Sequence, residues 1–412
     1  TPHLALRQLG RRSHTYINPL LLVITSLALG VYTLSMAASL DQWLIDRIYY
    51  NAGTDLSFSV YPLSEGTSEA TTVLTGEWIP QPANFADLEG VQAATPVGVY
   101  TVGTKLMNTG EFRGNFMAID RLTFPNVSWF RDDFARESLG ALMNQLATAT
   151  NGVLISRELF EANDLYIGDT INLSIAINYE FHIAEQFVVV GTFDYFPTVY
   201  EDERPVLIGN LEYLDFYIGM PVPHGIWMRL DAGADPQQVI KSIPTQLRIG
   251  TGREKDAINT IREEQGRFER VGVFGTLSVG FVAAVVMAVM GLLIYTYASL
   301  RERLERFTIL RAVGLLRSQI TAQVVMEYAF LTLYGSVGGA LIGSFASRLF
   351  VPLFRITGEA GVPLPPLIPI IAVDQVRFLI GIFVAVIIGL EVLVISRALS
   401  RRAFSLLKGV FD

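Results

Sequence analysis

Four separated apolar stretches constrain the fold of this 412-residue chain more than any other feature of its sequence. They cover residues 17–40, 271–300, 320–346 and 378–395, of which the last is the shortest. A helix needs about 20 largely apolar residues to cross a bilayer, and each stretch is close to or above that length. The first stretch is also too long for the apolar region of a typical signal peptide. The pattern therefore predicts an α-helical membrane protein with four transmembrane helices.

A long polar region, residues 41–270, separates the first two stretches. It contains 16 Lys and Arg residues against 32 Asp and Glu residues, a formal charge of −16, whereas the rest of the chain has 15 basic and 7 acidic residues. Short loops rich in Arg and Lys stay in the cytoplasm, whereas long domains cross the membrane largely regardless of charge. We therefore expect 41–270 and the loop 347–377 outside the cytoplasm. The segments 1–16, 301–319 and 396–412 are then cytoplasmic, and so are both termini.

The sequence of the polar region indicates a large mixed α/β extracytoplasmic domain inserted between helices 1 and 2. Runs rich in β-branched residues, bounded by Gly, Asp, Asn or Pro, predict strands at 152–156, 170–177, 187–193 and 225–230. Phe134, Leu139, Leu142 and Leu146 recur at near-helical intervals behind an acidic start and predict a helix over 131–149. Ser156 is placed to cap a further short helix.

Helical patterns continue on the outer side of the first two spans. Residues 39–50 extend the first span, and residues 256–300 can be interpreted as one helix that leads into the second. Its 45 residues would be about 68 Å long, against a bilayer core of about 30 Å. We expect the surplus to form a stalk that carries motion between membrane and outer domain. The alternative is a surface helix followed by an interruption at Gly266, Gly272 or Gly275.

The motifs of the common hydrolase and nucleotide-binding classes are missing from the sequence. There is no cysteine, no GxxxxGK[ST] sequence, no HExxH and no GxSxG. In the polar region only His182 and His224 could serve as imidazole ligands, and Glu180 beside His182 is too small a set for a metal site. The cytoplasmic segments are too short to hold a catalytic domain. We therefore expect no enzyme activity, no cofactor, no metal and no nucleic-acid partner, and we expect energy to come from another polypeptide.

The segment 301–319 has the pattern of an amphipathic helix beside the membrane. Oppositely charged residues four apart, such as Glu302 and Arg306, support a helix. Phe307, Leu310 and Val313 begin an apolar face that Leu316 and Ile320 continue. The alternative is a solvated loop whose positive charge only fixes topology.

Two features of the membrane stretches concern their packing and charge. Small residues repeat every four positions in the third stretch, which lets another helix approach closely, in this chain or across a dimer. They are Gly335, Gly339, Gly343 and Ser347. Glu327 and Glu391 lie a few residues inside the expected cytoplasmic boundary, where carboxylates can reach the interface or pair with Arg317, Arg397 or Arg401. Ion coupling is the alternative role for these two carboxylates.

Several phrases resemble the FtsX-like permease family, which includes the membrane subunits of MacB and LolC type ABC transporters. "RERLERFTILRAVGLLRSQI" (301–320) is similar to the element that follows the second span of this family, with its LRAxG phrase at 310–314. "VVMEYAFLTLYGSVGGALIG" (324–343) resembles its third span, and "ISRELFEANDLYIGDTINL" (155–173) and "FVVVGTFDYFPTVY" (187–200) resemble parts of its outer domain. The order of these phrases along the whole chain is more specific than any one of them.

The resemblance implies how such a chain would receive energy. The segment 301–319 would be a coupling helix that docks on a cytoplasmic ABC ATPase dimer. The docking residues would be Arg306, Phe307, Leu310, Arg311, Ala312, Val313 and Gly314. The two ends of the chain resemble the second half of longer, duplicated permeases, so a second permease half or copy is an expected partner, together with membrane lipid.

The function implied is that of a permease subunit in the bacterial inner membrane, which converts ATP hydrolysis by a separate ATPase into movement of its extracytoplasmic domain. The cargo would be a lipid, lipoprotein, peptide or drug. The alternative is an FtsX-like transmembrane relay that regulates an extracytoplasmic cell-wall hydrolase. An anchored ectoenzyme is a third reading, and no motif supports it.

Overall fold

The chain folds into two compact units in the computed structural model. The first is built from α2 as far as Trp43 together with α11, α13 and α14, and the second runs from Leu44 to Gly266. The structure describes residues 13–63, 76–106, 108, 110–178, 180–200, 204–266, 268–302, 316–353 and 364–408.

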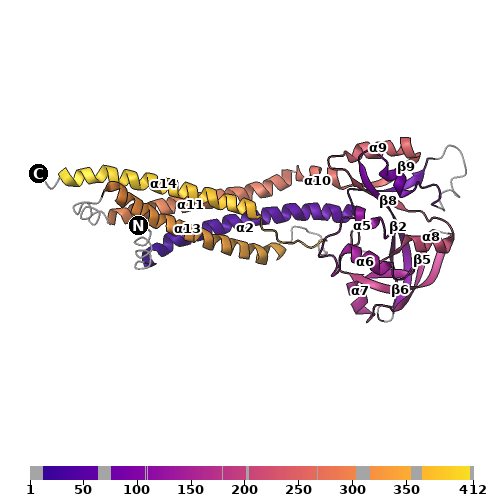
Figure 1. The fold of residues 1–412 in the computed structure, drawn as a ribbon. Coiled ribbons are helices and arrows are strands. Elements are labelled where there is room, and N and C mark those ends of the chain that lie inside the picture. The colour runs from indigo at the N-terminus through magenta and orange to yellow at the C-terminus, as the bar shows by residue number, and fades with distance from the viewer. Residues whose placement is uncertain are drawn as a thin grey trace. The chain divides into compact units, whose positions relative to one another are not determined.

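Four long helices make up the helical unit (Figure 1). They are α2 (Ser13–Ala52), α11 (Phe268–Glu302), α13 (Arg317–Phe350) and α14 (Val373–Lys408), and the 3-10 turn η1 (Val351–Leu353) follows α13. Each of them contains a segment long and apolar enough to cross a membrane: Ile17–Ala52, Ser278–Glu302, Ser318–Leu353 and Val373–Arg397. The prediction of four apolar helices is therefore confirmed, and the helices extend beyond the predicted apolar stretches.

The interior of the helical unit is small, and much of its apolar surface faces outward. One buried cluster joins α2, α11, α13 and α14 through residues such as Leu27, Leu292, Leu331 and Ile387. Large side chains such as Phe345, which is 70% exposed, point away from it. This distribution suits helices surrounded by hydrocarbon, since lipid tails are as apolar as leucine.

The second unit contains nine strands that follow α2 in the chain and precede α10. They are β1 (Leu56–Pro62), β2 (Val91–Leu106), β3 (Gly110–Ile119), β4 (Gly152–Ser156), β5 (Thr170–Ala176), β6 (His182–Phe193), β7 (Val206–Asn210), β8 (Gly225–Leu230) and β9 (Ile249–Asp256). In the described part of this unit, seven helices accompany them: α4 (Pro82–Ala86), α5 (Phe124–Val127), α6 (Leu139–Leu146), α7 (Arg157–Ala162), α8 (Leu211–Ile218), α9 (Pro236–Leu247) and α10 (Ala257–Gln265). The prediction of a mixed α/β domain is confirmed.

Strand pairing closes part of the sheet on itself. The strand order is β3-β7-β4-β6-β5-β2-β8-β1-β9, and β2 also pairs with β3, so six strands form a closed ring. All six contribute to one buried cluster, with members such as Val102, Phe116 and Phe187. Strands β8, β1 and β9 extend the sheet from β2 and form a separate core with α4 and α9.

The local predictions for this unit are mostly confirmed. The predicted strands appear as β4, β5, part of β6 and β8, and the Ser156 hydroxyl accepts from the Leu159 N–H at 3.4 Å as the N-cap of α7. The predicted helix over 131–149 is wrong in its first half, because α6 begins only at Leu139, after an N-cap at Ser138. Phe134, which was assigned to its apolar face, is instead buried in an aromatic cluster outside the helix.

The prediction of one uninterrupted helix over 256–300 is also wrong. α10 ends at Gln265 with a C-cap at Gly266, whose N–H donates to the Glu263 carbonyl oxygen, and α11 begins at Phe268. Glycine has a lower helix propensity than every residue except proline, so it favours an end at this position. The expected alternative, an interruption at Gly266, describes the chain correctly.

Candidate functional site

The chain enters and leaves the α/β unit at one place. β1, which follows α2, pairs with β9, which precedes α10, and the first residue of β1 lies opposite the last of β9. The Ala257 N–H donates to the Asp55 carbonyl oxygen at 3.0 Å. One carboxylate oxygen of Asp55 accepts from the Leu230 N–H at 2.9 Å, and the other accepts from the Tyr49 hydroxyl at 3.0 Å. Asp55 therefore ties together the end of α2, strand β8 and the start of α10.

A glycine ends α2 where the helix meets the sheet. Gly53 has a φ of +82°, and its N–H donates to the Tyr49 carbonyl oxygen at 2.7 Å, as in a helix C-cap. A Cβ at this position would lie 2.2 Å from the Trp227 ring. The Gly53 carbonyl oxygen accepts a hydrogen bond from the backbone N–H of Trp129 at 2.9 Å. Backbone conformation and close packing thus both require glycine here.

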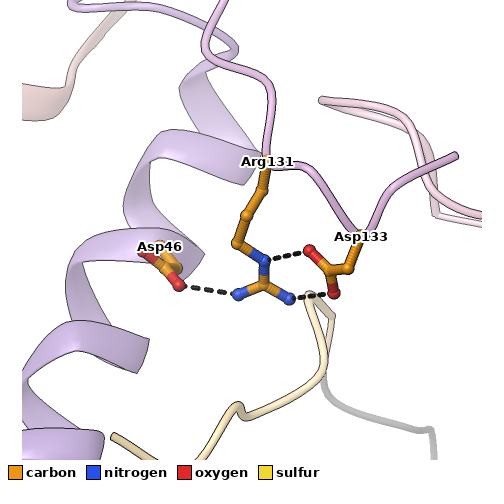
Figure 2. Close-up of polar contacts among 3 residues, drawn as sticks. All are labelled: Asp46, Arg131 and Asp133. Carbon is orange, nitrogen blue, oxygen red and sulfur yellow. Dashed lines mark hydrogen bonds and ion pairs between the residues drawn. The ribbon is translucent and has the colours of Figure 1, made fainter. Parts of the chain in front are cut away.

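Arg131 links α2 to the segment between α5 and α6 (Figure 2). Its Nη1 donates to Asp46 of α2 at 2.6 Å, and its Nε and Nη2 donate to the two carboxylate oxygens of Asp133 at 2.5 and 2.9 Å. The side chains of Arg131 and Asp46 are only 15% and 8% exposed. Burial by itself lowers the pKa of Arg131, but the hydrogen bonds to Asp133 and Asp46 outweigh it and raise the pKa. The guanidinium group therefore stays charged between two carboxylates.

Aromatic rings surround this ion-pair cluster, which we call the α2 anchor (Asp46, Arg131 and Asp133). The Arg131 guanidinium carbon lies 5.2 Å from the centre of the Phe134 ring, within cation–π range. The Tyr50 ring of α2 meets Phe134 edge to face at 5.6 Å, and its hydroxyl donates to the Val199 carbonyl oxygen. Tyr49 stacks on Trp129 at 5.8 Å. Residues from two segments distant in sequence, 129–134 and Val199, thus hold the last turns of α2.

The sequence contains only an indirect signal for the α2 anchor. Asp46 follows a largely apolar stretch, so a buried partner for it could be expected, but no spacing rule connects it to an arginine 85 positions later. The incorrect helix over 131–149 also hid this contact, because it placed Arg131 at the first position of a helix.

The predicted coupling residues lie outside the described residues. These are Arg306, Phe307, Leu310, Arg311, Ala312, Val313 and Gly314. The structure describes only the two ends of the 301–319 segment, which belong to helices α11 and α13. At the second end, Leu316 is 64% exposed and its N–H donates to the Gln319 side chain at 3.1 Å, while Ile320 is buried.

The small residues of α13 lie against α2. A Cβ on Gly335 would lie 2.7 Å from Val23, one on Gly339 2.8 Å from the Ile24 carbonyl oxygen, and one on Gly343 2.6 Å from the Ala28 carbonyl oxygen. The fourth member of the series, Ser347, is fully buried, and its hydroxyl donates to the Gly343 carbonyl oxygen at 2.8 Å. The two backbones approach so closely that any side chain larger than hydrogen at the three glycines would force them apart.

The two intramembrane carboxylates are both buried. Glu327 of α13 is 1% exposed and Glu391 of α14 is fully buried. Both carboxylate oxygens of Glu391 are buried without a hydrogen-bond partner in the described part of the chain. The expected pairing of Glu391 with an arginine is therefore not seen among the described side chains, which do not include those of Arg317 and Arg401.

Comparison with known families identifies the C-terminal part of the chain. Residues 278–403 match the family model described as FtsX-like permease C-terminal. The resemblance to the FtsX-like permease family is thereby confirmed for this part, which includes most of α11, all of α13, most of α14 and the predicted coupling segment. No curated protein sequence matches the chain.

Three solved structures of extracytoplasmic or permease domains are among those that are similar. The periplasmic region of MacB from Actinobacillus actinomycetemcomitans is 10% identical, with a TM-score of 0.33, and the match covers 53% of this chain and 95% of that one. The extracellular domain of the noncanonic ABC-type transporter YknZ from Gram-positive bacteria is 11% identical, with a TM-score of 0.30 and coverage of 52% and 97%. A domain of a putative permease protein from Porphyromonas gingivalis is 13% identical, with a TM-score of 0.29 and coverage of 49% and 89%.

Proposed function

We propose that this chain, whose residues 278–403 match the FtsX-like permease C-terminal family, is the permease subunit of an ABC transporter in the bacterial inner membrane. ATP is hydrolysed by a separate cytoplasmic ATPase dimer, and the chain converts that hydrolysis into movement of its α/β unit. The family match is the observation that carries the proposal, because it includes three of the four apolar helices and the basic segment between two of them.

The proposed path of force begins at the cytoplasmic side. The segment 301–319 links α11 to α13, so a push on it acts on both helices. α13 in turn touches α2 along the seam at Gly335, Gly339 and Gly343, where the contact includes backbone atoms. Because closely packed contacts transmit displacement and this seam includes backbone atoms of α2, α13 and α2 move together.

The proposed output is at the end of α2. The α2 anchor, the Tyr49 and Tyr50 contacts and the Asp55 hydrogen bonds attach this end to several strands and loops of the α/β unit. Since Asp55 also holds the start of α10, both connections of the unit to the membrane helices are fixed at one point. A displacement of α2 relative to α10 would therefore act directly on the sheet through β1 and β9.

The experiment that tests this function uses the full chain with its ATPase. We expect the chain to co-purify with a polypeptide that carries a Walker motif and to stimulate its ATP hydrolysis after reconstitution in lipid. Replacing Leu310, Arg311 and Val313 together by alanine should reduce this stimulation at least about fivefold. This is the factor that corresponds to the low end of typical coupling free energies between two sites. Replacing Arg401 and Arg402 in the C-terminal tail is the matched control and should leave it intact.

The outcomes separate the candidate functions. ATP-dependent release of a lipid or lipidated cargo from the membrane supports transport. Stimulated ATP hydrolysis without cargo release, but with activation of a co-purified wall hydrolase, would assign the chain to the relay class. If no nucleotide-binding polypeptide co-purifies with the chain, both candidate functions are contradicted.

A further inference from the structure

Glu391 lies on α14 between residues that belong to two separate apolar clusters of the helical unit. One cluster contains Leu292 of α11 and Ile387 of α14, and the other contains Leu300 of α11 and Ile395 of α14. Glu391 is one helical turn from each of the two isoleucines and is fully buried. Its side chain therefore belongs to the packed interior, not to a surface from which it could reach water.

A buried hydroxyl group lies at the corresponding position of α11, between residues of the same two clusters. Thr296 lies one turn from Leu292 and one turn from Leu300, and it is fully buried. Its hydroxyl has no hydrogen-bond partner in the described part of the chain, and neither do the buried hydroxyls of Thr332 and Ser336 on α13. Within the described residues, the interior thus contains these three buried hydroxyl groups and the buried carboxyl group of Glu391 without hydrogen-bond partners.

These hydroxyls differ from others in the same helices. Thr25, Thr33 and Ser347 donate to the backbone carbonyl oxygen four residues earlier, at 2.8 Å in each case. Serine and threonine in helices commonly satisfy themselves in this way. Since Thr296, Thr332 and Ser336 do not, they remain available to a group that enters or reorients within the interior.

An ionised Glu391 does not fit these surroundings. A buried carboxylate without a counter-charge or hydrogen bonds is far more costly than the neutral acid, and such a group takes up a proton. Residues 387–395 contain no other ionisable side chain, and neither does the part of α2 between residues 17 and 31. The nearest described arginines along α11 and α14, Arg301 and Arg397, are exposed. The buried titratable groups of the neighbouring helices are Tyr328 of α13, in the cluster with Ile395, with Tyr295 of α11 packed against it, and Glu327 of α13. None of these is a cation.

We propose that Glu391 is a proton-binding site of the helical unit, occupied by a proton in the packing seen here. A neutral carboxyl group has an O–H that can donate a hydrogen bond, and the buried hydroxyl oxygens of Thr296, Thr332 and Ser336 are its candidate acceptors. The proton can leave only when the helices separate enough to admit water or a cation to the carboxylate. Rearrangement of the bundle is therefore linked to proton release, and this packing is favoured when Glu391 is protonated. The inference requires the helical unit to lie in a membrane and does not require an ATPase.

Infrared spectroscopy of the full chain in lipid nanodiscs tests the proposal. At neutral pH we expect the carbonyl absorption of a protonated carboxylic acid, sensitive to exchange into D2O, which is lost in Glu391→Gln and kept in Glu327→Gln. The Gln variant should also retain the wild-type unfolding temperature, because a neutral side chain of the same shape replaces a neutral acid.

Three results would overturn it. The first is that Glu391→Gln removes only the absorption of an ionised carboxylate. The second is that sodium or potassium ions shift the absorption assigned to Glu391, which would make a metal cation the ligand. The third is that Glu391→Gln unfolds while Glu327→Gln does not, which would mean that the charged form is needed for folding. Because no ATPase is present, failure here leaves the proposed function standing.

Discussion

At the scale of single residues, the account depends on how Arg131 is held. A guanidinium group between two carboxylates and over a ring is a geometry that lysine cannot reproduce, since it needs donors in a fixed plane. If Arg131 is removed, we expect Asp46 to contribute the larger loss of stability, because its side chain is only 8% exposed. The α2 anchor is therefore expected to be stabilising as a unit and costly when only one member is removed.

We predict that Arg131→Ala lowers the free energy of unfolding by about 2–3 kcal/mol, because it removes the charged partner of a carboxylate, Asp46, whose side chain is only 8% exposed. Adding Asp46→Asn to this variant should recover part of the loss, with a coupling free energy of about 1–2 kcal/mol between the two positions. Unfolding of the full chain can be followed by tryptophan fluorescence, since Trp129 lies in the same aromatic cluster. The matched control is Arg136→Ala, at an exposed position. Equal losses for Arg131→Ala and Arg136→Ala would contradict the assignment.

At the scale of elements, patterns with a single strong period were predictable and those that depend on distant partners were not. The apolar helices, β4 and β8 were predictable, because each is specified by a continuous hydrophobic run in its own local sequence. The closed ring of six strands could not be predicted, because it needs the β3–β7 pairing between segments far apart in the sequence, and no local pattern specifies such partners. The seam of α13 was visible as a spacing of small residues, but its partner, α2, was not.

We predict that Gly339→Ala and Gly338→Ala, at adjacent positions of α13, differ sharply in effect. The Cβ of the first would lie 2.8 Å from a backbone oxygen of α2, whereas that of the second would lie 3.6 Å from the Ile24 side chain, an ordinary contact. Overpacking of this kind costs about 1–3 kcal/mol, and the gain in helix propensity from alanine offsets about 1 kcal/mol at most. Thermal unfolding in lipid should rank Gly338→Ala at or above wild type and Gly339→Ala below it. The reverse order would exclude the α2–α13 seam.

At the scale of the whole molecule, the proposal requires the α/β unit and the basic segment 301–319 to lie on opposite sides of the membrane. The basic residues of the short segments support this arrangement through the positive-inside rule, and a domain as long as 41–270 can cross the membrane regardless of its charge. If each of the four apolar helices in the described part of the chain crosses the membrane once, both termini lie on the same side, as the proposal requires. Every later step, from ATPase docking to movement of the α/β unit, depends on that sidedness.

Labelling of single cysteines tests this sidedness most directly, because the chain has no cysteine of its own. Asp132→Cys, at an exposed position of the α/β unit, and Arg311→Cys, in the coupling segment, are each treated with a membrane-impermeant maleimide in intact spheroplasts. We predict immediate labelling at 132 and labelling at 311 only after the membrane is permeabilised. Labelling of both positions in intact spheroplasts would contradict the account at its base.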